Sequence, residues 1–344
     1  MEFDLMARGS TWAESADLAK RLEGAGFSGM LVTEASQVPW MMIAAASMAA
    51  PTLDFSTGIA VAFPRSPMMS AQIAWELARN TQGRFRLGLG SQVKAHITRR
   101  YASLFDRPAP QMKDYLLAFK ACLRAFRREE ALHHDGPYYP LSLLPEQWSP
   151  ARHDYEDVKV DISAVGPYMV KVAGAIADGI HVHPMHSMPY IQNRLPPGLV
   201  EGAAQTGRDA AAIDLIVPVF AIPGDSPEER AAGVLRCKTQ IGFYGATPNY
   251  SFQFDDLGYV GMREKLRVHL KSGDTDALVA LIDDEMMDHF GIVARWDDLA
   301  DQLIARYLGK ASRVVMYLAE ESIRQNPDNL GKWSEIARAV RAAA

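Results

Sequence analysis

Two glycine-rich segments end apolar runs and lead into helix-forming sequence. Residues 83–92 read Gly-Arg-Phe-Arg-Leu-Gly-Leu-Gly-Ser-Gln, and residues 162–169 read Ile-Ser-Ala-Val-Gly-Pro-Tyr-Met. Glycine lets a backbone come close to a flat or phosphorylated group, and the first turn of a helix offers free N–H groups to an anion. The second segment therefore predicts an anion site in which the N–H groups of Tyr168 and Met169 point outward beyond Gly166.

Acidic and basic side chains stand where other strand-like runs end. Glu34 is suited to accept a hydrogen bond from a ring N–H or a hydroxyl group of a ligand. Lys94 and His96 place a cation and a hydrogen-bond donor just beyond residues 88–92. For these three residues, a solvated position in a loop is the alternative. Gly58 lies inside a strand-like run, which indicates a bulge, a close approach of another group, or a packing requirement.

Two histidines and a tyrosine are further candidates. His181 and His183 alternate in residues 179–183, so they share one face of a strand. Two imidazoles on one face suit a metal, but no third ligand has a suitable spacing. We therefore favour packed or hydrogen-bonding histidines and keep a metal-dependent barrel hydrolase as an alternative. Tyr244 ends a predicted helix and is expected either to line a substrate site or to pack in the core.

Apolar periodicity predicts eight strands that alternate with helices. The strands are expected at residues 3–6, 27–33, 54–62, 85–89, 158–164, 179–183, 213–222 and 312–318. The helices are expected at residues 11–24, 38–50, 70–82, 111–127, 168–177, 189–205, 227–242, 297–308 and 329–343. This order predicts an α/β protein with a (β/α)₈ TIM barrel, in which chemistry takes place at the C-terminal ends of the strands. A doubly wound sheet is disfavoured, because no Gly-x-Gly-x-x-Gly motif opens the chain.

Composition narrows the classes of partner. One barrel domain is expected across residues 1–344, with an irregular excursion at about 129–157 and a helical insertion at about 251–295. A net charge of −5 argues against a nucleic-acid partner, and no apolar run approaches the roughly 20 residues that span a bilayer. Cys122 and Cys237 lack a metal-binding spacing. With no signal-peptide pattern, the cysteines predict a reducing, cytoplasmic location.

Taken in order, five segments resemble the bacterial-luciferase-like superfamily, and within it the F420-dependent oxidoreductases. These segments are residues 57–67, 83–97, 164–169, 177–184 and 243–248. The resemblance implies a TIM barrel that binds a deazaflavin or a flavin at its C-terminal mouth, and a homodimer. It also implies a cis peptide between Gly58 and Ile59. The residues it assigns to the cofactor are Glu34, Gly58, Ile59, Val61, Gly90, Ser91, Lys94, Ala164, Val165, Gly166, Pro167, Tyr168 and Met169.

The activity expected from this resemblance is hydride transfer between coenzyme F420 and a small organic substrate with a C=C, C=N or C=O group. His96 and Glu34 are the expected catalytic residues, and the expected substrate contacts are Trp40, Phe63, His183 and Tyr244. Sugar-phosphate dehydrogenases of this superfamily have an acid where Ser91 stands and a histidine where Ala35 stands, so a sugar phosphate is disfavoured. The alternatives are an FMN-dependent luciferase-like monooxygenase and a non-catalytic cofactor-binding protein.

Overall fold

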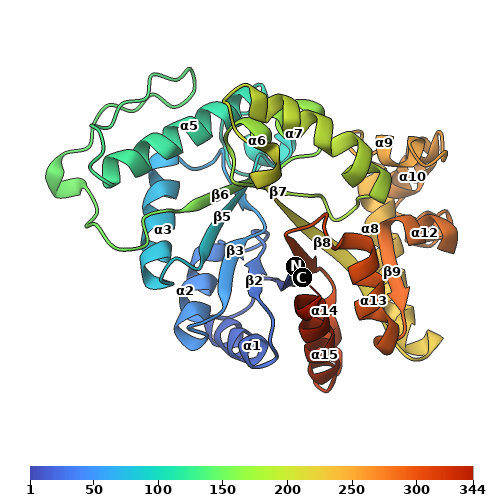
Figure 1. Ribbon diagram of the computed structural model, residues 1–344. Coiled ribbons are helices and arrows are strands. Elements are labelled where there is room, and N and C mark those ends of the chain that lie inside the picture. The colour runs from blue at the N-terminus through green and yellow to red at the C-terminus, as the bar shows by residue number, and fades with distance from the viewer. Residues whose placement is uncertain (344) are drawn as a thin grey trace.

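A parallel sheet closed into a barrel forms the centre of the protein, with helices around it (Figure 1). The computed structural model describes residues 1–343. The strands are β1 (Glu2–Ala7), β2 (Gly29–Val32), β3 (Asp54–Thr57), β4 (Ala60–Val61), β5 (Phe85–Gly90), β6 (Lys159–Ser163), β7 (Gly179–His181), β8 (Asp214–Pro223), β9 (Gly291–Ala294) and β10 (Arg313–Met316). Their order is β10-β1-β2-β3-β5-β6-β7-β8, and β10 pairs with β8 to close the ring. The predicted TIM barrel is therefore confirmed.

Helices connect the strands and cover the outside of the barrel. They are α1 (Trp12–Gly24), α2 (Pro39–Ala49), α3 (Pro67–Asn80), α4 (Lys94–Arg99), α5 (Pro108–Phe126), α6 (Pro167–Ile176), α7 (Leu195–Ala204), α8 (Pro227–Gly245), α13 (Trp296–Tyr307), α14 (Ala319–Gln325) and α15 (Asn329–Ala342). Proline in the first turn opens several of them, including α2, α3, α5 and α6, because its fixed φ suits a helix start. Of the helices in the described chain, none has the length and apolar character to cross a membrane.

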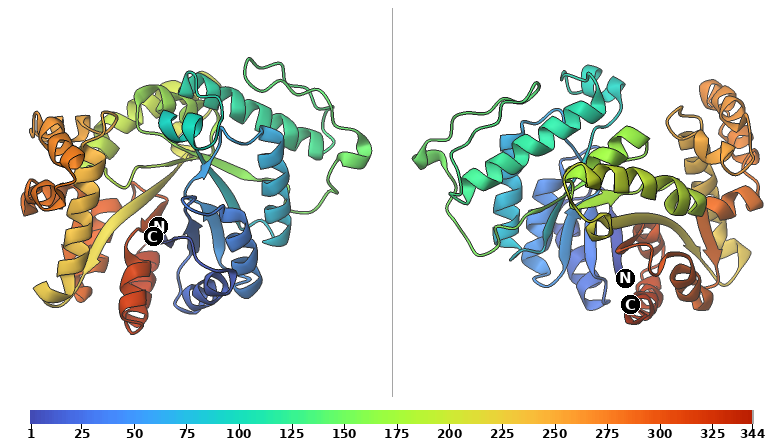
Figure 2. Two further views of the ribbon diagram at one scale, coloured as in Figure 1. Left: turned by 180° about the vertical axis from the view of Figure 1, so that it is seen from behind. Right: turned by 45° about the horizontal axis from the view of Figure 1, so that its top comes forward.

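Two long excursions leave the barrel on different sides (Figure 2). The irregular segment at residues 129–157 contains one short 3₁₀ turn, Glu146–Trp148, and an antiparallel bridge between His134 and Leu141. The second excursion carries α9 (Phe252–Asp255), α10 (Met262–Ser272), α11 (Thr275–Ala280) and α12 (Asp284–Phe290). These helices pack with α8 around an apolar cluster separate from the main core, with Phe254, Leu266 and Met286 fully buried in it. The helical character predicted for this insertion is confirmed for most of its length.

The end of that insertion was predicted as helix and is instead strand β9. Its residues pair in parallel with the last four residues of β8, from Phe220 opposite Gly291 to Pro223 opposite Ala294. Strand β8 is ten residues long, and the barrel strand β10 pairs only with its first half, up to Val219. The last residues of β8 have backbone N–H and C=O groups that β10 does not pair with. Residues 291–294, which include the β-branched Ile292 and Val293, pair with these groups as a strand.

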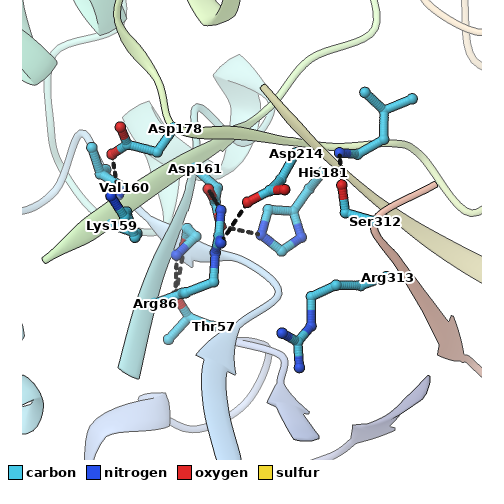
Figure 3. Close-up of polar contacts among 12 residues, drawn as sticks. Thr57, Arg86, Lys159, Val160, Asp161, Asp178, His181, Asp214, Ser312 and Arg313 are labelled. Carbon is cyan, nitrogen blue, oxygen red and sulfur yellow. Dashed lines mark hydrogen bonds and ion pairs between the residues drawn. The ribbon is translucent and has the colours of Figure 1, made fainter. Parts of the chain in front are cut away.

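Partly buried ion pairs lie at the N-terminal end of the barrel, and Figure 3 shows those of Arg86. Arg86 of β5 donates to both carboxylate oxygens of Asp161 at 2.8 and 2.6 Å and to Asp214 at 2.7 Å. Arg313 of β10 makes the equivalent contacts to Asp4 at 2.7 and 2.9 Å and to Asp54 at 2.9 Å. Because β5 and β8 are not neighbours in the sheet, their side chains meet across the inside of the barrel. This ionic floor closes the end of the barrel opposite the strand C-termini.

Candidate functional site

A cavity of about 1100 Å³ opens at the C-terminal ends of the strands, above the ionic floor. Residues from the barrel strands and the loops that follow them line it: Met6, Thr33, Gly58, Ser91, Ser163, Val165, His183, Pro218 and Tyr317. This position is where TIM barrels carry their active sites, and the volume suits a cofactor together with a small substrate.

The wall formed by the third barrel strand is interrupted by a cis peptide between Gly58 and Ile59, as the resemblance implied. The Gly58 carbonyl accepts a hydrogen bond from Thr33 Oγ1 at 3.0 Å, and the Ile59 carbonyl accepts one from the Glu34 N–H at 3.3 Å. The Ile59 N–H has no partner within the described chain. A Cβ on Gly58 would lie 1.9 Å from Leu31 Cδ2, so only glycine fits there. Gly58 and Ile59 thus both line the cavity, and the Ile59 N–H is an unused donor there.

Glu34 lies on this wall, but its carboxylate is fully engaged. Arg65 donates to its two oxygens at 2.8 and 2.5 Å, and the Val61 N–H donates to Oε2 at 2.7 Å. Arg65 also donates to the Val61 carbonyl, and its guanidinium lies 5.4 Å from the ring centre of Trp40. Glu34 and Arg65 therefore tie the loops after β2 and β4 together behind the cavity wall.

One end of the cavity is cationic. Helix α6 begins there, with Gly166 at its N-cap and no side chain capping it. The N–H groups of Tyr168 and Met169 make no hydrogen bond to any residue from 1 to 343. Lys113 of α5 and Lys171 of α6 line the same end. Free N–H groups at a helix N-terminus together with two ammonium groups form a site for an anion.

His181 forms part of the cavity floor and connects it to the ion pairs below. Its side chain is 4% exposed, and its Nε2 atom lies 3.7 Å from Asp161 Oδ2 with no hydrogen-bond partner in the described chain. Gly88 makes room for the ring, since a Cβ there would lie 2.6 Å from Nε2. Burial alone would raise the pKa of Asp161, but Arg86 and His181 hold that pKa at about 2. Asp161 is thus a fixed negative charge beneath the imidazole (Figure 3).

The other end of the cavity is aromatic. The His183 ring stacks on Tyr250 with a centroid distance of 4.0 Å and meets Tyr244 edge-on at 4.5 Å. Tyr317 and Asn249 complete this end. Burial lowers the pKa of His183 to about 3, although a contact with the Met185 backbone opposes the shift. His183 is therefore a neutral imidazole throughout the physiological range of pH.

The predicted site residues divide into two sets. Those that line the cavity are Glu34, Gly58, Ile59, Ser91, Val165, Gly166, Pro167, Tyr168, Met169, His183 and Tyr244. Those that the structure does not bring to its surface are Trp40, Val61, Phe63, Gly90, Lys94, His96 and Ala164. Lys94 and His96 lie on exposed faces of α4, where Ile97 is the buried residue. Phe63 packs instead against Phe105, with ring centres 5.8 Å apart.

Several cavity residues were not among the predicted ligand contacts. Thr33 and Tyr317 lie at strand ends, which the barrel rule selects, but no role was predicted for either. Lys113 and Tyr250 come from a helix and an insertion whose approach to the cavity has no sequence signal. The metal-hydrolase alternative needs a third ligand beside His181 and His183. In residues 1–343 no group of three or more His, Cys, Asp or Glu side chains is placed to hold an ion.

Comparison with known proteins supports the same family. The family model described as luciferase-like monooxygenase matches residues 2–311. The chain belongs to this family. It is 34% identical over 303 residues to an uncharacterized protein of Mycobacterium tuberculosis, covering 88% of this chain and 89% of that protein. It is 20% identical over 290 residues to the 5,10-methylenetetrahydromethanopterin reductase of Archaeoglobus fulgidus, covering 83% of each.

Solved structures of luciferase-like proteins agree with the fold. The coenzyme F420-dependent tetrahydromethanopterin reductase of Methanopyrus kandleri superimposes with a TM-score of 0.78 at 17% identity, covering 98% of this chain and 97% of that one. Because the match covers nearly the whole of both chains, it confirms the TIM-barrel fold. Relatives of this chain therefore include F420-dependent oxidoreductases as well as monooxygenases.

Proposed function

We propose that the protein is an F420-dependent oxidoreductase that transfers a hydride between the deazaflavin and a small organic substrate. The observation that carries this proposal is the division of one cavity into three parts. These are a flat wall at Gly58–Ile59, a cationic end at α6 and an aromatic end at His183. A planar ring with an anionic tail and a separate substrate would use all three parts.

The residues present fit a deazaflavin on structural grounds. Gly58 and Ile59 line the cavity and the Ile59 N–H is unpaired, so a flat ring placed against Gly58 could accept a hydrogen bond there. The unpaired N–H groups of Tyr168 and Met169, with Lys113 and Lys171, would hold a phosphate. When bound, the deazaflavin supplies the hydride chemistry, and the protein supplies position and electrostatics.

The chain's own residues have the following parts in this proposal. Glu34 and Arg65 hold the ring wall in place rather than exchanging protons, since every carboxylate oxygen is already paired. His181 presents its ring from the floor of the cavity, with Nε2 3.7 Å from Asp161 Oδ2. We propose His181, in place of His96, as the group that holds a proton near the reacting atoms.

Cofactor titration tests the proposal. Purified protein should quench the fluorescence of F420 on binding, with a dissociation constant in the micromolar range or below, and should bind FMN more weakly. A substrate panel should then show oxidation of the reduced deazaflavin, which a non-catalytic binding protein would not show. Saturable FMN binding with no F420 binding would overturn the proposal.

A second function is an FMN-dependent monooxygenase, which the description of the family model favours. It predicts substrate-dependent oxygen uptake in the presence of reduced FMN, whereas hydride transfer from F420 proceeds under nitrogen. Measuring both activities on one preparation separates the two functions.

A further inference from the structure

The two ends of the cavity differ in charge, and the difference bears on the substrate. The end at α6 carries Lys113, Lys171 and Arg107, of which Arg107 pairs with Asp106 of the same lining and Lys171 pairs with Glu201. The other end is formed by neutral residues: His183, Pro218, Tyr244, Asn249, Tyr250 and Tyr317. No lysine or arginine of the described lining belongs to this second group. A ligand here meets aromatic faces and neutral polar atoms only.

The proton on His183 can be located from its contacts. Two Met185 groups contact Nδ1 of His183, and the N–H group, which donates to it at 3.1 Å, lies nearer than the carbonyl oxygen at 3.4 Å. The shorter contact favours Nδ1 as the acceptor. A ring nitrogen that accepts a hydrogen bond uses its lone pair, so in a neutral imidazole the proton sits on the other nitrogen. The ring is neutral because burial holds its pKa at about 3. His183 therefore carries its proton on Nε2.

That Nε2–H group is an unused donor at the cavity surface. Among residues 1–343 it has no acceptor, and it is not one of the buried unpaired atoms, so the cavity gives access to it. Leaving such a group unpaired when a ligand excludes water costs free energy, so the site favours ligands that offer an acceptor.

The donor is held rigidly by three segments of chain. Tyr250 covers one face of the His183 ring at 4.0 Å and Tyr244 meets its edge at 4.5 Å. The loop after His183 is fixed by the buried Gln253, whose amide donates to the Met185 carbonyl at 3.2 Å and accepts from Ser187. A donor fixed in this way needs no reordering when a ligand arrives.

We propose that this end of the cavity binds a neutral, planar carbonyl compound whose oxygen accepts a hydrogen bond from His183 Nε2. The inference rests on the proposed function and selects the C=O group among its possible substrates. The aromatic walls match a flat apolar face. The described lining of this end offers no lysine or arginine to an anionic substrate such as a sugar phosphate, although the exposed Arg8 lies close enough to act on the Tyr244 phenol. In the reducing direction, the carbonyl carbon accepts a hydride from the reduced deazaflavin and the oxygen takes a proton from water. The carbonyl is reduced to an alcohol as the deazaflavin is oxidised.

Calorimetric titration with three matched probes tests this inference. Acetophenone has the planar ring and the carbonyl, ethylbenzene lacks the oxygen, and phenyl phosphate carries a charge in its place. We expect acetophenone to bind about threefold to tenfold more tightly than ethylbenzene, as one added hydrogen bond allows, and phenyl phosphate to bind more weakly than either at this end. Equal affinity for acetophenone and ethylbenzene would overturn the proposal. A preference for phenyl phosphate would also overturn it if Lys113→Ala and Lys171→Ala left that preference unchanged, because the anion would then not be binding at the cationic end.

Variants identify the residue responsible. His183→Phe should abolish the preference for acetophenone over ethylbenzene, His183→Gln should retain part of it through its amide N–H, and Tyr250→Leu should weaken both probes alike. A preference that survives in His183→Phe would overturn the assignment. In protein labelled with ¹⁵N-histidine, the Nε2 resonance of His183 should shift with acetophenone and not with ethylbenzene. This measurement uses the unaltered protein and does not depend on the folding of a variant.

Each titration is run with and without F420. If F420 does not bind but the carbonyl preference is present, the proposed function fails and the aromatic-end site stands. If F420 binds and the preference is absent in both states, the function stands and this inference fails.

Discussion

Glu34 and Arg65 form a two-point ion pair directly behind the cavity wall, with N–O distances of 2.8 and 2.5 Å. The Glu34 side chain is 3% exposed and that of Arg65 is 16% exposed. Since the carboxylate also accepts the Val61 N–H, both of its oxygens are hydrogen-bonded. The pair joins the end of the second strand to the broken third strand.

Removing the cation from this pair should destabilise the fold. Arg65→Met leaves the buried Glu34 carboxylate without its cation and with only the Val61 N–H as a donor, so the free energy of unfolding in urea should fall by about 3 kcal/mol. Arg124→Met is the matched control, because both side chains of its pair with Glu130 are exposed and the pair is worth less than about 1 kcal/mol. A loss for Arg65→Met no larger than that of the control would show that the pair is not structural.

The cationic end of the cavity should make cofactor binding depend on salt. Lys113→Ala and Lys171→Ala should each raise the dissociation constant for F420 about threefold, with Lys20→Ala, on exposed α1, as the control without effect. For the unaltered protein, affinity should fall as ionic strength rises. The deazaflavin chromophore without its phosphate tail should bind independently of salt. Salt-independent binding of F420 would place the phosphate elsewhere.

His186 should make stability fall in acid. Its Nδ1 contacts the His183 carbonyl at 2.9 Å and its Nε2 the Tyr307 hydroxyl at 3.0 Å, and burial lowers its pKa to about 4. Between the ordinary value near 6.5 and about 4, the unfolded chain binds a proton that the folded chain refuses. The free energy of unfolding therefore decreases as pH falls through this window, by about 2 kcal/mol at pH 5.

Urea unfolding at pH 7 and pH 5 measures this difference. His186→Gln should reduce the difference in the free energy of unfolding between pH 7 and pH 5 by about 2 kcal/mol. The contribution of His183 to this difference has the same sign and should remain. His133→Gln, at an exposed position, should leave the pH dependence unchanged. A slope unaltered by His186→Gln would show that the buried ring does not set it.

Removal of Arg86 from the ionic floor should destabilise the fold. Arg86→Met leaves the fully buried Asp161 without its main partner, so we expect a loss of about 4 kcal/mol in the free energy of unfolding. Lys159→Met is the control from the same end of the barrel, since its pair with Asp157 is exposed and is worth at most about 1 kcal/mol. Similar losses in both variants would mean that the floor is not held by this ion pair.

His96→Ala should leave cofactor affinity and turnover within about twofold of the parent values, because the side chain is exposed on α4 and lies outside the cavity lining. His181→Asn should lower turnover while F420 still binds. Once a substrate is found, steady-state rates measure both. If turnover fell strongly in His96→Ala and was unchanged in His181→Asn, the proposed role of His181 would belong to His96 instead.

Sequence reasoning located the strands because period and burial agree along each run. The eight barrel strands lie where apolar alternation placed them, and the Thr11 cap of α1 is present, with its hydroxyl accepting the Glu14 N–H at 3.2 Å. Strand β9 was missed because four residues at the end of a helical insertion carry too little periodicity. They became a strand only because the long β8 left an edge for them.

The cavity was harder to predict than the barrel, because most of its contacts join distant parts of the chain. Glu34 and Arg65 are 31 residues apart, and nothing local indicates that they pair. The alternation of His181 and His183 predicted that they share one face of a strand. It did not predict that His181 lies over Asp161 or that His183 stacks on Tyr250. Tyr250 reaches the cavity only because the insertion folds back against α8.

The location of Tyr244 and Tyr250 bears on how this protein and its relatives diverge. Both side chains pack onto the apolar cluster of the insertion, which is distinct from the core that closes the barrel. Replacements there can alter which compound is accepted while the machinery for redox chemistry and the foundations of the barrel stay as they are. The same barrel can therefore come to accept new substrates through changes in this insertion, with little effect on folding of the barrel.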